Sequence, residues 1–239
     1  MSQHKELLYE GKAKKVFKTE TPDQYYLEFK DSLTAFNALK KGTFENKGQL
    51  NRDIAARLFE YLKGRGIASH YVSSHGTNGM VVKKVEIIPF EVVVRNILAG
   101  STAKKLGIDE GVALTEPLVE FYLKNDELAD PFVSEEQIRI IYKIPTAQMQ
   151  EIKNYALRIN DHLKELFVGI GIKLIDFKVE FGTDSKDQVL LADEITPDCC
   201  RLWDIKTNEK LDKDRFRRDL GSIKESYEDV NNRLMQALK

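Results

Sequence analysis

The chain has 239 residues, of which 42% are hydrophobic and 31% charged, so it can form one or two domains with a substantial core. Its net charge of −1 argues against nucleic acid as the main partner, because a phosphate-reading surface usually leaves a basic excess. Cys199 and Cys200 are adjacent and are expected to be reduced, which indicates a cytoplasmic protein. No segment approaches the roughly 20 apolar residues of a membrane span, and the N-terminus lacks an apolar signal region.

Three short strands around turns are expected near the N-terminus, at about 7–10, 16–19 and 25–29. The first turn, Gly11 to Lys15, reads GKAKK. A glycine at a hairpin tip lets the backbone approach phosphates closely, and the flanking lysines neutralise their charge. The segment is neither a P-loop nor a G-x-G-x-x-G motif, and a solvated basic turn is the simpler alternative.

Residues 31–47 are polar with little periodicity, so we expect a loop that could close over a site. After it the pattern predicts a helix and then two strands, over 49–63, 71–72 and 80–84. His70 and His75 have no histidine or cysteine partner at metal-ligand spacing, which favours ordinary surface or turn roles.

The segment from Lys83 to Pro89 is expected to be a strand broken by the proline, which could form a hinge whose backbone borders an adenine. Arg95 ends an apolar strand, where an arginine costs desolvation energy unless it has an anion. Gly100 and Ser101 follow, and small residues and hydroxyls before a helix suit a phosphate. An arginine satisfied by carbonyls, with an ordinary loop glycine, is the alternative.

A strand over 118–124 and a capping box from Ser134 to Gln137 precede a long amphipathic helix over 146–167. The apolar stripe of that helix is expected to be core and consists of Met149, Ile152, Ala156, Ile159, Leu163 and Leu166. Asp212 is expected to cap a short basic helix, and a final helix is predicted over 222–238.

The segment LIDFKVEFG, 174–182, alternates with a period of two. Asp176, Lys178 and Glu180 share one face of this predicted strand. A short polar turn leads to a second strand that ends in Asp193-Glu194, and a hairpin would return these carboxylates toward Glu180. Carboxylates that converge beside a lysine can hold Mg²⁺ with nucleotide phosphates. The alternative is an exposed sheet face with alternating charge.

These motifs resemble the SAICAR synthetase family, phosphoribosylaminoimidazole-succinocarboxamide synthases of purine synthesis. The similarity lies in IIPFEVVVRNILAGS, LIDFKVEFG and ADEITPDCCRLWD, and it extends from LLYEGKAKKVF to DKDRFRRDLG. The resemblance implies an α+β, two-lobed ATP-grasp-like architecture with antiparallel sheets and the active site in the interlobe cleft. We expect a nucleotide-covering lobe over 1–85, a lobe with the metal and ribotide sites over 86–239, and a homodimer.

The resemblance also implies an ATP-dependent ligase that joins L-aspartate to the carboxylate of carboxyaminoimidazole ribotide (CAIR). The products would be SAICAR, ADP and phosphate. A carboxylate is a poor electrophile, so an acyl phosphate is the expected intermediate, and positioning and charge stabilisation would dominate the phosphoryl transfer. Such an intermediate must be protected from water, which would give the polar loop over 31–47 a reason to close.

By the same resemblance, each motif residue takes an expected role. Glu180 and Asp193 would hold Mg²⁺. The ATP-binding residues would be Lys12, Lys14, Lys83, Val85 and Lys124. The substrates would be bound by Arg95, Ser101, Arg201 and Arg217. Asp176 and Lys178 would line the reactive end of the ribotide as catalytic residues, whereas the two thiols have no assigned chemistry.

Two other functions remain open at this point. Another ATP-grasp-like ligase or kinase could use the same nucleotide site with a different acceptor, although Arg95, Ser101 and Arg201 favour a phosphorylated one. A non-catalytic nucleotide-binding protein could keep the lysines but would not need both Glu180 and Asp193.

Overall fold

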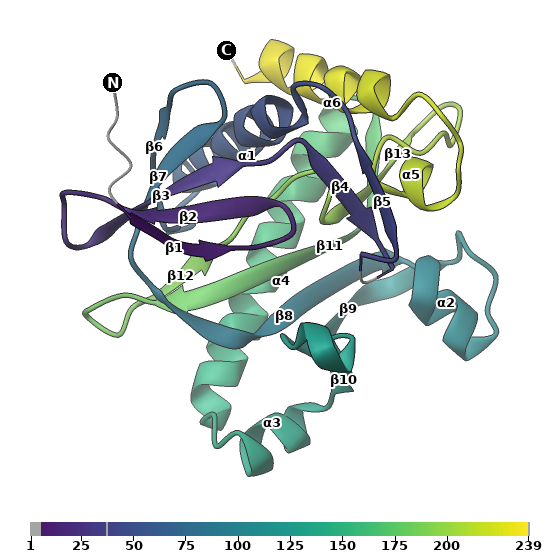
Figure 1. Ribbon diagram of the computed structural model, residues 1–239. Helices are drawn as coiled ribbons and strands as arrows, with labels where there is room; N and C mark the ends of the chain where they lie inside the picture. Colours follow the sequence, from purple (N-terminus) through teal and green to yellow (C-terminus); the bar gives the residue numbers. More distant parts are fainter. Residues whose placement is uncertain (1–5, 37, 239) are drawn as a thin grey trace.

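The computed structural model describes residues 6–36 and 38–238. Two large antiparallel sheets occupy consecutive parts of the chain, and helices pack around them (Figure 1). The α+β class with antiparallel sheets is therefore confirmed. Residues 1–5, on which part of the expectation about the N-terminus falls, and Asn37 of the expected loop lie outside the described residues.

The first sheet has five strands in the order β1-β2-β3-β7-β6. Their bounds are Glu6–Glu10 for β1, Lys14–Lys18 for β2, Gln24–Phe29 for β3, Tyr71–His75 for β6 and Gly79–Lys83 for β7. The expected GKAKK turn is confirmed as the tip of the β1–β2 hairpin, where the Gly11 amide donates to the Lys14 carbonyl at 2.8 Å. The basic tip therefore projects from a paired, defined hairpin.

The second sheet has the order β10-β9-β8-β11-β12, and β13 also pairs with β11. Its bounds are Glu86–Ile97 for β8, Ala113–Leu123 for β9, Phe132–Val133 for β10, Ile172–Thr183 for β11, Val189–Ala192 for β12 and Cys200–Asp204 for β13. The expected β11–β12 hairpin is confirmed. It pairs Glu180 with Ala192, so Asp193 and Glu194 leave β12 beside Glu180.

Six α-helices are found in the described residues: α1 Lys47–Lys63, α2 Gly100–Leu106, α3 Glu135–Ile141, α4 Thr146–Gly169, α5 Asp214–Arg217 and α6 Ile223–Ala237, with a 3-10 turn at Asp126–Leu128. α1 packs between the first sheet and α6, and α4 packs against β8, β9 and β11 (Figure 1). The expected stripe of α4 is buried, and the capping box of α3 is present. None of the described helices is long and apolar enough to cross a membrane.

One hydrophobic core connects the two sheets. It includes Leu27 and Met80 of the first sheet, Val92 and Phe177 of the second, and Leu234 of α6. Backbone hydrogen bonds also join the parts of the chain, because the segment after α1 pairs with β12 through an isolated parallel bridge between residues 69 and 191. The position of the first sheet is thus fixed relative to the carboxylates at the end of β12.

Residues 31–47 form more regular structure than the expected loop. They contain a hairpin of β4, Ser32–Ala35, and β5, Lys40–Thr43, and α1 begins at residue 47. The hairpin turn includes Phe36 and Ala38 at φ 53° and 63°, a left-handed backbone region that neither residue type favours. Phe36 and Ala38 are not usual turn residues, which is why the pattern failed to predict the two strands.

Pro89 does not break its strand, which corrects the expected hinge. β8 runs through Pro89, and the register between β8 and β11 shifts between Glu91 and Ile87. Such an irregularity leaves a residue outside regular pairing, and a proline, which has no amide hydrogen to donate, is tolerated there. The Pro89 carbonyl still accepts from the Lys124 amide at 3.0 Å.

Candidate active site

Two adjoining cavities lie beside the second sheet, and the first sheet lines one of them. The larger has a volume of about 660 Å³ and is lined by the β1–β2 tip, β3, β4 and the ends of β11 and β12. The smaller has a volume of about 150 Å³ and is lined mainly by β8, β11 and the segment that includes β13. Lys178, Asp198 and Cys199 line both cavities. A group bound at these three residues can therefore contact the contents of either cavity.

The larger cavity gathers the predicted nucleotide and metal residues. Its lining includes Lys12, Lys14, Lys83, Val85, Lys124, Glu180 and Asp193. Apolar side chains also line it, among them Val16, Leu27, Val82 and Ile87. A cavity with one set of apolar walls and another of charged side chains suits a ligand with a flat apolar part and an anionic part.

Lysines and carboxylates alternate along the charged side of this cavity. The Lys14 Nζ donates to Asp193 Oδ1 at 2.5 Å and to Glu194 Oε1 at 2.7 Å. Glu180 accepts from Lys178 at 3.0 Å and from Lys124 at 2.5 Å. These contacts link β2, the residue after β9, β11 and the end of β12, so residues far apart in the sequence form one electrostatic unit.

These ion pairs outweigh the cost of burial. Burial disfavours the Lys14 ammonium, but Asp193 and Glu194 raise its pKa above the usual range. Burial likewise opposes the charge on Lys178, whose pKa is raised by Glu180, Asp193 and Glu91. Burial also disfavours the Asp193 carboxylate, yet Lys14 and Lys178 hold the pKa of Asp193 below its usual range. All three groups are therefore charged at neutral pH.

The described residues contain no cluster of three or more histidine, cysteine, aspartate or glutamate side chains that could hold a metal by themselves. Glu180 and Asp193 nevertheless line the same cavity and are hard oxygen donors. Mg²⁺ at nucleotide sites usually takes one or two carboxylates and completes its shell with water and phosphate oxygens. The donor set therefore fits Mg²⁺ that arrives with a nucleotide, and the assignment stays a prediction.

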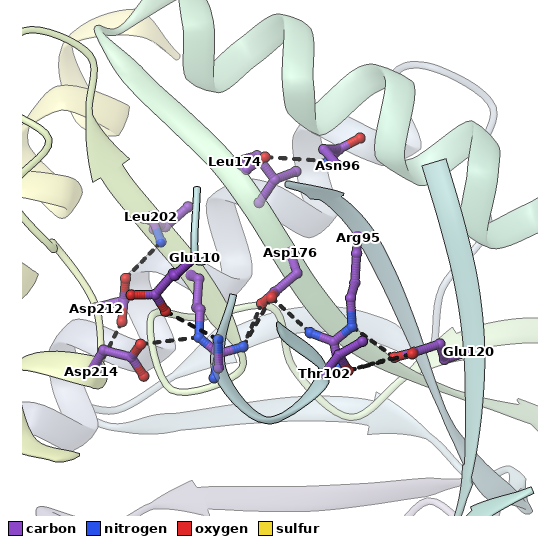
Figure 2. Close-up of polar contacts among 12 residues, drawn as sticks. Arg95, Asn96, Thr102, Glu110, Glu120, Leu174, Asp176, Leu202, Asp212 and Asp214 are labelled. Atoms are coloured by element: carbon purple, nitrogen blue, oxygen red, sulfur yellow. Dashed lines mark hydrogen bonds and ion pairs between the residues drawn. The ribbon is translucent and has the colours of Figure 1, made fainter. Parts of the chain in front are cut away.

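The smaller cavity gathers Arg95, Asp176, Lys178, Arg201 and Arg217. Asp176 lies between two guanidinium groups: Arg95 donates to it at 2.8 Å and Arg201 at 2.9 Å. Figure 2 shows the same arginine, Arg95, also turned toward a second carboxylate, Glu120, at 2.7 Å. The anion expected beside the buried Arg95 is thus a pair of protein carboxylates. The guanidinium groups of Arg95 and Arg201 are both held in place beside the cavity.

Gly100 and Ser101, the two residues expected to suit a phosphate before a helix, are the first two residues of α2. Ser101 is exposed in the first turn of α2 and is not among the residues that line either cavity. Gly100 has φ 62°, and a Cβ built there would clash with Arg201 Nη2. Gly100 therefore leaves room for a guanidinium of the site, while a ligand contact by Ser101 stays a prediction.

In the basic segment near the C-terminus, Asp212 supports the backbone and Arg217 faces a cavity. Asp212 accepts from the Asp214 amide at 2.7 Å and from the Leu202 amide of β13 at 2.7 Å (Figure 2), while the N-cap position of α5 is Lys213 rather than the expected Asp212. Burial, with the Asp214 charge as the next cause, raises the pKa of Asp212 to about 7. Arg217 donates to Asp214 and lines the smaller cavity.

Sequence reasoning missed four residues of this site. Glu91 accepts from Lys178 at 2.8 Å and lines the larger cavity. A period of two counted back from Arg95 places Glu91 on the same face of β8, so this residue could have been found. Asp198 and Lys213 also line the larger cavity, but no local pattern distinguishes them, because the partners of Asp198 come from α1 and α6.

The fourth missed residue, His70, corrects the expected surface or turn role. It is 4% exposed, and its Nε2 lies 3.1 Å from the Asp193 carbonyl oxygen. Burial lowers the pKa of His70 to about 4, with the Asp193 charge opposing and the Lys14 charge adding to the effect. His70 is therefore neutral at physiological pH and supports the backbone that carries Asp193.

Known proteins are similar to this chain in both sequence and fold. A family model described as SAICAR synthetase matches residues 7–234. A phosphoribosylaminoimidazole-succinocarboxamide synthase from Lysinibacillus sphaericus (strain C3-41) is 53% identical over 229 residues, which cover 96% of this chain and 97% of that relative.

Solved structures agree with the sequence comparison. The crystal structure of phosphoribosylaminoimidazole-succinocarboxamide synthase from Ehrlichia chaffeensis has a TM-score of 0.94 and 46% identity, covering 97% of this chain and 99% of that one. A SAICAR synthetase (Type-2) in complex with ADP has a TM-score of 0.92 and 44% identity, covering 95% and 96%. The chain therefore belongs to the SAICAR synthetase family.

Proposed function

We propose that this protein joins L-aspartate to the carboxylate of CAIR with ATP, giving SAICAR, ADP and phosphate in purine biosynthesis. The observation that carries the proposal is the junction of the two cavities at Lys178 and Asp198. One cavity has the apolar walls and lysines that suit ATP, and the other has the arginines that suit an anionic acceptor. The relative with bound ADP, at 44% identity, supports the nucleotide assignment.

The nucleotide is assigned to the larger cavity. Lys12, Lys14 and Lys124 would turn from their carboxylates to the phosphates, and the walls near Val85 would hold the base. Exchange of a carboxylate for a phosphate keeps each ammonium paired, so the charges need little reorganisation. Glu180 and Asp193, released from the lysines, would hold Mg²⁺, which would neutralise phosphate charge when bound.

The acceptor is assigned to the smaller cavity and its opening. Arg95 and Arg201, fixed by Asp176, would bind the anionic ribotide, with Arg217 beside them and Ser101 as an additional proposed contact. Lys178 stands at the junction, where its ammonium would stabilise charge on the reacting carboxylate and on the transferring phosphoryl group.

The chemistry would then proceed in two steps. A carboxylate oxygen of CAIR attacks the γ-phosphorus, the bond to the ADP oxygen breaks, and an acyl phosphate forms. The amine of L-aspartate attacks the acyl carbon, loses a proton and displaces phosphate, which forms the amide. Both steps occur between groups bound in the two cavities, so positioning across the junction accounts for much of the rate.

We also infer a homodimer in the cytoplasm and a lobe boundary near residue 85. The two cysteines of the described chain are free thiols, which suits a reducing compartment. The boundary is supported by the end of the first sheet at Lys83 and the start of the second at Glu86. Sedimentation at several protein concentrations would measure the oligomeric state.

The test of the function is ADP release with Mg·ATP when L-aspartate or CAIR is left out in turn. We expect ADP only with both substrates, together with an equal amount of SAICAR. ADP formation with CAIR alone would indicate acyl phosphate formation uncoupled from amine attack. Absence of turnover with all three substrates, or ATP turnover that ignores CAIR, would contradict the proposal.

A further inference from the structure

Lys213 is a shielded cation in the cavity wall without a close partner. Its side chain is 16% exposed, and the nearest carboxylate oxygen, Asp198 Oδ1, lies 3.9 Å from its Nζ. Within the described residues its ammonium makes no hydrogen bond. The other shielded lysines of this cavity, Lys14 and Lys178, each have a carboxylate oxygen within 3.0 Å. Among the shielded lysines of this cavity, Lys213 is thus the one whose ammonium has no close carboxylate.

Asp198 cannot satisfy Lys213 by turning toward it. Its Oδ2 accepts from Lys47 at 2.5 Å and from Asn51 at 2.8 Å, both on α1. Its Oδ1 accepts from the Tyr227 hydroxyl of α6 at 2.8 Å. Three donors on two helices therefore fix the carboxylate, and a rotation toward Lys213 would break shorter bonds to gain one.

The backbone also fixes where Lys213 stands. Its amide donates to the Pro197 carbonyl at 3.1 Å, and its carbonyl accepts from the Arg217 amide at 3.0 Å. Lys213 lines the larger cavity, whereas Arg217, four residues later, lines the smaller one. Asp198, which lines both, lies between these two parts. The two cations therefore flank the junction at which the amine must meet the acyl group.

The charges around Lys213 favour the binding of an anionic ligand. Burial lowers the pKa of Lys213, and the Asp198 charge, with a smaller effect of Glu194, only partly offsets it, while Arg217 and Lys47 add to it. A buried ammonium without a close counter-ion is costly, and an anionic ligand would remove that cost. The amine donor of the proposed reaction carries two carboxylates. Arg217 could neutralise only one of them, so a second cation is needed.

We propose that Lys213 binds a carboxylate of L-aspartate and determines the selectivity of the enzyme for a dicarboxylate amine donor. The inference rests on the proposed function and adds a residue to it. Asp198 is a positioning residue in this arrangement, because it contacts Lys213 and anchors the wall through α1 and α6.

The test is steady-state kinetics of Lys213→Met, which keeps the length and apolar stem of the side chain and removes the charge. We expect the KM for L-aspartate to rise about 10- to 100-fold, the range for losing a charged hydrogen bond, while the KM values for ATP and CAIR stay within about twofold. Lys213→Arg should recover part of the loss. Lys206→Met, in an exposed turn, removes the same charge and should match the wild type.

Amine donors that lack one carboxylate separate recognition from a structural effect. L-asparagine and L-aspartic acid α-amide each replace one carboxylate by an amide and keep the amine. The wild type should discriminate against the donor that lacks the carboxylate bound by Lys213. In Lys213→Met, that discrimination relative to L-aspartate should fall by about the factor by which the KM for L-aspartate rises, as in a double-mutant cycle. An equal loss with all donors, an unchanged KM for L-aspartate, or a rise confined to ATP or CAIR would overturn the inference.

The controls keep this inference distinct from the function itself. A wild-type protein that forms no SAICAR would defeat the proposed function, whereas wild-type turnover with an unaltered Lys213→Met would defeat only the role of Lys213. ADP affinity and the thermal midpoint report whether Lys213→Met is folded. If it is not, Lys213→Gln takes its place, and the same kinetic criteria apply.

Discussion

Glu180 is the carboxylate on which two lysines of the larger cavity meet. Lys124 and Lys178 both donate to it, and it is almost fully buried. Glu180→Gln keeps the shape and removes the charge that we assign to Mg²⁺. We expect kcat to fall at least ~10²-fold, as for the loss of one electrostatic stabiliser at a reacting centre. Turnover at saturating substrates measures this effect.

A matched control for that variant is Glu209→Gln, which changes an exposed carboxylate in the turn after β13. It should leave kcat unchanged. Near-normal turnover of Glu180→Gln, with a thermal midpoint like that of the wild type, would remove Glu180 from the metal assignment.

His70 gives the stability a defined pH dependence. Burial lowers its pKa from 6.5 to about 4, so between these values the unfolded chain binds a proton that the native protein does not. The free energy of unfolding should therefore fall as pH decreases through this window, by at most about 1.4 kcal/mol per pH unit from this group. Urea unfolding at pH 7, 6 and 5 measures the slope.

His70→Gln isolates that contribution. The glutamine amide can still donate to the Asp193 carbonyl but does not titrate, so the variant should lose less stability than the wild type on acidification. Asp212, whose pKa is raised to about 7, acts in the opposite sense and is present in both proteins. Parallel pH profiles of the two proteins would contradict a buried neutral histidine at position 70.

At the residue scale, the sequence motifs predicted which charged groups would meet but not how each is paired. Lys12, Lys14, Lys124, Glu180 and Asp193 do line one cavity. The surroundings of His70 could not be predicted, because its partner carbonyl belongs to a residue 123 positions later in the chain. Burial of this kind is a property of tertiary packing and leaves no local pattern.

Among the elements, the β4–β5 hairpin has contacts that suit a cover for the site. Ser32 and Thr34 of β4 line the larger cavity. On the other strand, Lys40 forms an ion pair with Asp219 at 2.7 Å and lies over the Phe216 ring. The hairpin therefore connects the larger cavity with the segment around α5.

Trypsin cleavage after Lys40 and Lys41 tests whether the hairpin closes. We expect Mg·ATP with CAIR to slow cleavage there at least about tenfold, because ligands that bind the closed form reduce the population of the open one. Cleavage after the exposed Lys206 serves as the internal control. Equal rates at Lys40 with and without ligands would contradict closure.

Elements with a clear period were predicted well, and those with unusual turns were not. The β11–β12 hairpin and α4 follow regular alternation or helical spacing, and both are present. The β4–β5 hairpin was missed because its turn uses left-handed residues other than glycine. The strand through Pro89 was misread because a bulge accommodates a proline that the sequence pattern treats as a break.

The whole molecule depends on contacts between its two ends. The family resemblance implied the two-lobed architecture, but the sequence alone did not indicate that one core would run through both sheets. α6, at the end of the chain, packs on α1, which itself covers the first sheet. Asp198, at the junction of the two cavities, is bonded by side chains of both helices. The stability of the C-terminal helix and the geometry of the site should therefore be coupled.

Tyr227→Phe tests this coupling by removing the hydroxyl that donates to Asp198 at 2.8 Å. The ring can keep its edge contact with Phe44, so the loss is confined to one hydrogen bond to a charged group. We expect the free energy of unfolding to fall by about 1.5–3 kcal/mol, with the KM for L-aspartate rising because Asp198 is held less firmly beside Lys213. Urea unfolding and steady-state kinetics measure the two effects. A destabilised variant with unchanged kinetics would show that α6 supports the fold without positioning the site, because Lys47 and Asn51 would then suffice to hold Asp198.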